Sequence, residues 1–191
     1  MHQDLTRAIT DDIAVSYEAA LAQLNDAHMR YQSAPLAHMR LAEKRDDIAA
    51  MRKVADGLAD GAARILVLGT GGSSLGAQVL AQTHGALTPA GQIAGPQLIF
   101  VDNLDAETFA RLLQEDMSTT RFLVVSKSGG TAETMMQLGG ALNALAANGL
   151  SPASHIAAIA GRGDNALRRL AETYGFVLLD HEDEIGGRFS V

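Results

Sequence analysis

Two segments rich in glycine, serine and threonine hold the side chains of this chain that are best suited to chemistry. Residues 69–76 read GTGGSSLG, and residues 126–131 read SKSGGT. Each segment follows a short apolar run and precedes a helical pattern, so its backbone N–H groups should lie at a helix N-terminus. Such amides, together with the helix dipole, stabilise a bound phosphate. The two segments therefore predict a site for a phosphorylated small molecule.

The second segment would offer an anion three hydroxyls and one ammonium group, from Ser126, Ser128, Thr131 and Lys127. A hydrogen bond to a charged group contributes roughly 1.5–3 kcal/mol. A handful of such bonds would hold a phosphate dianion in spite of the negative net charge of the chain. The alternative interpretation is an ordinary turn in which Thr131 caps the following helix.

The first segment also begins like a dinucleotide-binding fingerprint, with Asp102 placed where an acidic residue would bind a ribose. However, Ser74 occupies the third motif position, where glycine or alanine is required, and this interpretation gives the second segment no role. Ala77 and Gln78 stand where a P-loop requires lysine and serine or threonine, which argues against a nucleotide triphosphate. A tight turn without a ligand is the remaining alternative.

A third segment lies near the end of the chain, where Gly186 and Gly187 precede Arg188. Two glycines let the backbone approach a ligand closely and direct the guanidinium, although a plain surface loop is the alternative. The preceding residues 181–184 read HEDE and invite a metal interpretation. Adjacent carboxylates on a loop are usually solvated, and the histidines lack ligand spacing, so no metal site is expected.

The composition describes a globular protein with an aliphatic core. The 191 residues are 47% hydrophobic and 19% charged, and they include neither tryptophan nor cysteine. The net charge of −7 argues against nucleic acid as a partner. The absence of cysteine fits a reducing cytoplasm, and no stretch resembles a signal peptide or a membrane span, so a cytoplasmic protein without membrane contact is expected.

Short apolar runs alternate with helical patterns from about residue 61 onward. This alternation predicts the α/β class, with a doubly wound, five-stranded parallel sheet in the flavodoxin-like order 2-1-3-4-5. In that order, the segments after the first and third strands flank the point where the strand order reverses, which is where ligands bind. The expected strands are residues 65–68, 98–101, 121–125, 156–159 and 176–179.

Helical spacing predicts two helices before the sheet, over residues 5–25 and 36–58. They would form an N-terminal helical extension, residues 1–60, packed on the sheet of a domain that spans residues 61–191. Asp105 and Asp164 are expected to begin helices. The expected helices within the sheet domain are residues 75–85, 105–114, 131–148 and 164–174.

Three motifs, in this order, resemble those of the glucose-6-phosphate isomerase family. Residues 69–76 resemble G-I-G-G-S-x-L-G, residues 126–134 resemble S-K-[ST]-x-[TG]-T-x-E-T, and residues 186–190 resemble G-G-R-[FY]-S. Thr70 replaces the usual isoleucine, and Gly130 stands where many members have threonine. The resemblance implies a sugar isomerase (SIS) domain and the reversible aldose–ketose isomerisation of glucose 6-phosphate and fructose 6-phosphate, in glycolysis and gluconeogenesis.

The resemblance also implies roles for individual residues. Arg188 would stabilise a cis-enediolate intermediate, and Glu133 would support the site. Gly72 and Ser73 would face the sugar. The phosphate would be bound by Ser126, Lys127, Ser128 and Thr131. No metal or organic cofactor is implied, the partner would be a small sugar phosphate, and the full-length protein would be a homodimer.

Members of that family are several hundred residues long and have a second SIS domain. The family's proton-abstracting glutamate, ring-opening histidine and a further lysine lie beyond the point that matches the end of this chain. The leading hypothesis is thus an N-terminal part of such an isomerase, which lacks the second domain and the base and turns over little alone. The alternatives are a non-catalytic, single-SIS-domain sugar-phosphate sensor and a dinucleotide-binding domain.

Overall fold

The computed structural model describes residues 11–83 and 95–186, and the chain divides into two compact units, residues 1–44 and 45–191. The first unit contains α1 (Asp11–Ser33), α2 (Ala37–Arg40) and a single 3₁₀ turn, η1 (Leu41–Glu43). The expected end of the first helix near residue 25 is wrong, because α1 continues to Ser33. The start that we expected at residue 5 lies outside the described residues.

The expected single helix over residues 36–58 is also wrong. The helical turns end at Glu43, Lys44 is extended with φ −72° and ψ 128°, and α3 (Ile48–Ala59) begins after this break. Residues 43–47 are all charged, so a helix continued through them would bury no apolar side chain. The domain boundary expected at residue 60 stays a prediction, while the second compact unit begins at Arg45 and includes α3.

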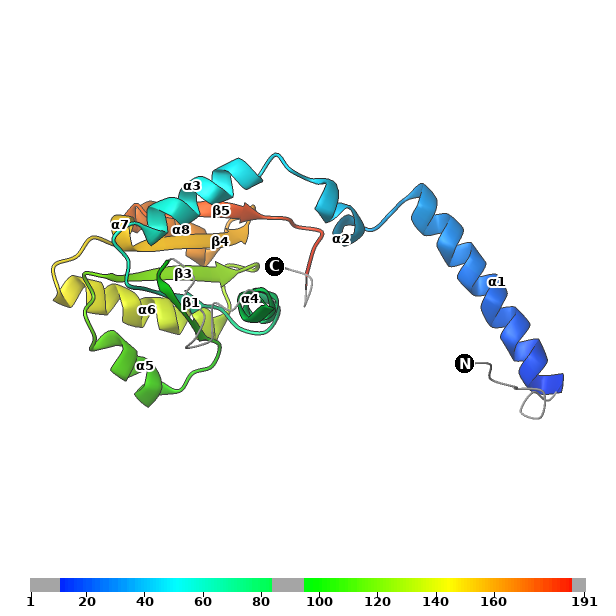
Figure 1. The fold of residues 1–191 in the computed structure, drawn as a ribbon, viewed down its shortest axis with the longest axis horizontal. Coiled ribbons are helices and arrows are strands. Elements are labelled where there is room, and N and C mark those ends of the chain that lie inside the picture. The colour runs from blue at the N-terminus through cyan, green and yellow to red at the C-terminus, as the bar shows by residue number, and fades with distance from the viewer. Residues whose placement is uncertain (1–10, 84–94, 187–191) are drawn as a thin grey trace. The chain divides into compact units, whose positions relative to one another are not determined.

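A five-stranded sheet lies at the centre of the second unit, in the order β2-β1-β3-β4-β5 (Figure 1). All four strand pairs are parallel, and Leu66 of β1 lies opposite Ile99 of β2 and Phe122 of β3. The predicted fold class and strand order are therefore confirmed. The strands are β1 (Arg64–Leu68), β2 (Gln97–Val101), β3 (Thr120–Ser126), β4 (Ile156–Gly161) and β5 (Val177–His181).

Helices cover both faces of this sheet, as Figure 1 shows for α3 on one side and α5 and α6 on the other. One face packs its fully buried side chains, such as Phe122 and Val124, against Leu138 and Leu167 of the helices. The other face packs against α3 through Leu58. The remaining helices of this unit are α4 (Gly72–Thr83), α5 (Ala106–Leu113), α6 (Ala132–Ala147), α7 (Pro152–His155) and α8 (Ala166–Tyr174).

The starts of these helices follow local capping chemistry. Asp105 caps α5, as predicted, by accepting a hydrogen bond from the Thr108 N–H at 2.8 Å. The prediction that Asp164 caps α8 is wrong, because the Asn165 side chain accepts from the Arg168 N–H at 3.0 Å instead. The short helix α7 was not predicted. No helix among the described residues has both the length and the apolar character that crossing a bilayer requires.

Candidate functional site

The candidate site lies at the edge of the sheet where β1 and β3 end. These strands are parallel neighbours, so the loops that follow them emerge from the same edge. Their backbones come into close contact there, since a Cβ on Gly69 would lie only 3.0 Å from the carbonyl oxygen of Val125. The sheet order reverses between these two strands, which makes this edge the ligand-binding position of an open α/β sheet.

The loop after β1 is shorter than the sequence suggested, because α4 begins at Gly72 and not near Leu75. Gly71 has φ +56° and makes the turn into the helix, and its carbonyl accepts hydrogen bonds from the N–H groups of Ser74 and Leu75 at 3.1 and 3.0 Å. Gly72 and Ser73 therefore form the first turn of a helix at this edge. Both are half-buried.

Asp102 and Ser74, which featured in the dinucleotide interpretation, are linked to each other by Gln78. The Gln78 amide donates to Ser74 Oγ at 2.7 Å and to Asp102 Oδ2 at 3.0 Å. Ser74 is buried, with 1% of its surface exposed. These contacts join α4 to the residue after β2, and they give Asp102 a structural partner within the domain.

The loop after β3 brings three hydroxyls together. Thr131 Oγ1 lies 3.0 Å from Ser126 Oγ and 3.3 Å from Ser128 Oγ. Thr131 occupies the N-cap position of α6, but its side chain makes no capping hydrogen bond. Thr131 thus occupies the N-cap position, as the alternative interpretation expected, but its hydroxyl contacts Ser126 and Ser128 and does not cap the helix. The first-turn N–H groups of α6, which have no intrahelical acceptors, lie beside this hydroxyl cluster.

Backbone hydrogen bonds hold this loop in place. Gly129 donates to the Ser126 carbonyl at 2.9 Å and accepts from the Leu167 N–H at 2.8 Å. The Lys127 carbonyl accepts from the Gly161 N–H at 2.9 Å. The end of β4 and the first turn of α8 thus hold the loop after β3 through the hydrogen bonds from Gly161 and Leu167. Gly129 has φ +62°, a conformation that favours glycine.

Of the three charged residues expected at the site, the structure describes Lys127 and Glu133. The Lys127 ammonium donates to the main-chain carbonyl of Asp183, in the turn after β5, at 2.6 Å. Glu133 is exposed in the first turn of α6. Arg188 lies outside the described residues, so its expected role stays a prediction.

Arg162 contacts acidic residues at the end of β5 and in the turn that follows it. The Arg162 guanidinium lies 3.6 Å from the Asp180 carboxylate and 3.8 Å from that of Glu182. The backbone N–H of Arg162 donates to Asp183 Oδ1 at 3.4 Å.

Sequence reasoning missed Asn165, Gly161 and Asp183 as supports of the loop after β3, because their contacts join segments distant in the chain. In the part of the chain that the structure describes, no cluster of three or more acidic or histidine side chains could hold a metal ion.

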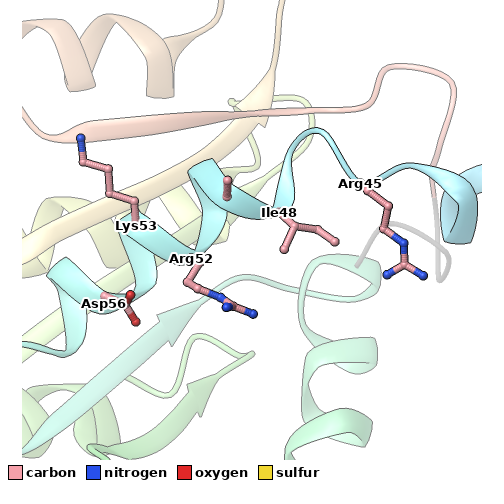
Figure 2. Close-up of a pocket in the computed structure, with 6 residues that line it drawn as sticks. Arg45, Ile48, Arg52, Lys53 and Asp56 are labelled. Carbon is pink, nitrogen blue, oxygen red and sulfur yellow. The ribbon is translucent and has the colours of Figure 1, made fainter.

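A shallow hollow of about 570 Å³ lies along α3 and includes Arg45, which precedes this helix (Figure 2). Three cations line it, Arg45, Arg52 and Lys53, with Ile48 and Asp56. Figure 2 shows Lys53 on the opposite side of α3 from Arg52 and Asp56. The positive charges therefore do not converge on one anion, which makes the sheet edge the better candidate.

A second cavity, of about 490 Å³, lies on the sheet face that α3 and α4 cover. Its lining is almost entirely apolar, with Ser73 and His181 as the polar side chains. Ile65, Val67 and Val125 form part of its floor. Such a surface offers a sugar phosphate few hydrogen-bonding partners, although the cavity reaches the first turn of α4 at Gly72.

Comparisons with known proteins show which proteins this chain is similar to. The family model for phosphoglucose isomerase matches residues 30–191. A glucose-6-phosphate isomerase of Rubrobacter xylanophilus is 36% identical over 165 residues, which are 82% of this chain and 38% of the relative. One from Acaryochloris marina is 36% identical over 130 residues, 66% of this chain and 23% of that relative. The chain thus spans less than half the length of these relatives.

Solved structures show the same fold. A hypothetical protein from Thermus thermophilus superposes with a TM-score of 0.72 at 29% identity, over 93% of this chain and 42% of that chain. A glucose-6-phosphate isomerase from Chlamydia trachomatis gives a TM-score of 0.58 at 28% identity, over 77% of this chain and 29% of that chain.

Proposed function

Because the chain belongs to the phosphoglucose isomerase family, we propose that it forms the phosphosugar-binding part of a glucose-6-phosphate isomerase. The reaction would be the reversible conversion of glucose 6-phosphate into fructose 6-phosphate. The observation that carries the proposal is the convergence of the Ser126, Ser128 and Thr131 hydroxyls at the start of α6. This cluster lies beyond the carboxyl end of β3, at the reversal of strand order.

In this proposal the phosphate dianion binds at the loop after β3. The hydroxyls of Ser126, Ser128 and Thr131 reorient to donate to its oxygens, and the first amides of α6 donate alongside them. Lys127 adds a positive charge to the same loop. Gly72 and Ser73, in the first turn of α4, face the sugar from the neighbouring strand.

The chemistry would move a proton between C2 and C1 of the open-chain sugar through a cis-enediolate. The enediolate carries negative charge, which Arg188 would stabilise electrostatically. Glu133 would support the site from the first turn of α6. A general base must abstract the proton, and we assign that role to none of the described residues.

Further properties are inferred from the same family membership. The 191 residues alone should bind sugar phosphates and turn them over slowly or not at all, without a metal or organic cofactor. We infer a cytoplasmic location, a homodimer in proteins of the relatives' length, and no nucleic-acid or membrane partner.

Calorimetric titration tests the proposal directly. The protein should bind fructose 6-phosphate and glucose 6-phosphate, and it should bind fructose and glucose at least tenfold more weakly, because the phosphate supplies the charge-assisted bonds. Equal affinity for the phosphorylated and unphosphorylated sugars would refute the phosphate site. Tight binding of NADH in a parallel fluorescence titration would favour a dinucleotide-binding domain instead.

A coupled assay for glucose 6-phosphate, started with fructose 6-phosphate, tests the second part. Little turnover is expected from the 191 residues. Turnover at the rate of the longer relatives would mean that a base lies within this chain.

A further inference from the structure

We propose that Lys127 is a positioning residue, which fixes the turn after β5 against the loop after β3 and is not itself a ligand of the bound phosphate. This changes the role that the family resemblance implies for Lys127. It rests on the proposed function only in assigning a phosphate to the loop that contains Lys127. The turn in question is residues 182–186.

The first support is the reach of the lysine side chain across the sheet edge. Lys127 directly follows Ser126, the last residue of β3, and its ammonium donates to the Asp183 carbonyl at 2.6 Å. In the sheet, β4 lies between β3 and β5. The side chain therefore spans the end of β4 to join the connections that follow two non-adjacent strands.

The second support is the glycine at the end of β4. Gly161 donates its N–H to the Lys127 carbonyl at 2.9 Å. A Cβ at this position would lie 2.8 Å from that carbonyl oxygen and 3.4 Å from Asp183 Oδ1. Only a residue without a side chain lets the loop after β3 and the turn after β5 approach each other this closely.

The third support is the turn itself, which is fastened at several points. Arg162 N–H donates to Asp183 Oδ1 at 3.4 Å, and Ile185 N–H donates to the Glu182 carbonyl at 3.3 Å. Ile185 is buried, with 4% of its surface exposed. A Cβ on Gly186 would lie 3.3 Å from the Lys127 ammonium nitrogen, so glycine leaves the ammonium its space.

The position of this turn in the sequence gives the clamp a consequence. Arg188 follows Gly186 by two residues, so whatever fixes the turn fixes the point from which the Arg188 segment begins. An ammonium bound to a carbonyl makes a charge-assisted hydrogen bond, which is stronger than a neutral one. Lys127 would thereby join the loop that we propose binds the phosphate to the point where the segment containing Arg188 begins.

Hydrogen exchange of the 191-residue chain tests the clamp without any ligand. Lys127→Met removes the ammonium and keeps most of the aliphatic stem. The amide of Ile185 should exchange roughly three- to tenfold faster, as expected for the loss of one partly exposed charge-assisted bond. Lys53→Met, which removes an exposed lysine on α3, should leave this amide unchanged.

Titration with fructose 6-phosphate separates positioning from direct binding. The Lys127→Met dissociation constant should stay within about threefold of the wild-type value, whereas one lost phosphate ligand would weaken binding roughly tenfold or more. Unchanged exchange at Ile185 combined with a tenfold loss of affinity would overturn the proposal. If the wild-type chain fails to bind the sugar phosphate, the proposed function fails, but the exchange result still decides on the clamp.

A second variant guards against misfolding of the first. Gly186→Ala keeps the lysine but places a methyl group 3.3 Å from the flexible end of its side chain, so it should accelerate exchange at Ile185 less than Lys127→Met does. Lys127→Arg, which retains a cation able to donate to the Asp183 carbonyl, should restore at least part of the protection. Fast exchange in Lys127→Arg equal to that of Lys127→Met would show that the cation is not what holds the turn.

Discussion

Gly129 and Asn165 fit together so closely that residue 129 has no room for a side chain. A Cβ on Gly129 would lie 1.9 Å from Oδ1 of Asn165 and 2.2 Å from its Cγ. The same Oδ1 accepts the hydrogen bond from the Arg168 N–H that caps α8. The loop that holds the hydroxyl cluster and the start of α8 are therefore packed as one unit.

Gly129→Ala should consequently destabilise the protein by about 2–4 kcal/mol. The methyl group must displace the Asn165 cap, and alanine is strained at φ +62°. Gly130→Ala is the matched control, because a Cβ there meets no atom within 4 Å. Its free energy of unfolding should change by less than about 0.5 kcal/mol. Urea denaturation measures both, and equal effects of the two substitutions would contradict the packing argument.

Much of the sheet was predictable from the sequence because each strand is a short apolar run that ends in a polar or glycine-rich segment. The runs beginning at Ile65 and Phe122 are examples, and parallel strands buried on both faces require this pattern. The turn after β3 was predictable for a related reason, since its two glycines mark the break between the strand and the following helix.

The remaining errors come from side-chain contacts that residue types and spacing alone do not reveal. Asp164 and Asn165 are both good N-cap residues, but Asn165 also donates to the carbonyls of Gly161 and Gly163, at 3.1 and 2.8 Å. A carboxylate has no proton to donate there, so these two contacts within the turn favour asparagine at the cap. The contact of Lys127 with Asp183 joins residues 56 positions apart, which no local pattern reveals.

Ser128→Ala should weaken the binding of fructose 6-phosphate roughly tenfold or more, because one charge-assisted hydrogen bond contributes about 1.5–3 kcal/mol. Ser128 is exposed in the loop after β3, so its replacement by alanine should leave the fold intact. Ser154→Ala is the control, since Ser154 lies in α7, before β4 begins. Calorimetry decides the point, and an unchanged affinity of Ser128→Ala would remove the loop after β3 from the phosphate site.

The stability of the protein should fall as acid protonates Asp105 and Asp116. The hydrogen bond from the Thr108 backbone N–H lowers the pKa of Asp105 below its ordinary value of 3.8, and bonds from the hydroxyl and N–H of Ser118 lower the pKa of Asp116 in the same way. A carboxyl whose pKa is lower in the folded state contributes stability above the unfolded value. That contribution is lost as the pH falls through the folded value.

The test is the slope of unfolding free energy against pH between about pH 5 and pH 2. The double variant Asp105→Asn, Asp116→Asn keeps a side-chain oxygen at each position but cannot titrate. Its stability should fall less steeply over this range than that of the wild type. Parallel slopes for the two proteins would show that these carboxyls do not control acid stability.

The two faces of the sheet should respond oppositely to added volume. Ala77 of α4 lines the apolar cavity of about 490 Å³, so Ala77→Leu can place its extra carbons in unfilled space. Filling such space commonly stabilises a protein by about 0.5–2 kcal/mol.

Ala141 of α6 is fully buried in the close-packed core of the opposite face, with 0% exposed surface. Ala141→Leu should therefore destabilise by about 1–3 kcal/mol, the usual effect of overpacking. Thermal and urea unfolding of both variants would check this contrast. A destabilisation by Ala77→Leu as large as that by Ala141→Leu would mean that the face covered by α3 and α4 is already filled in solution.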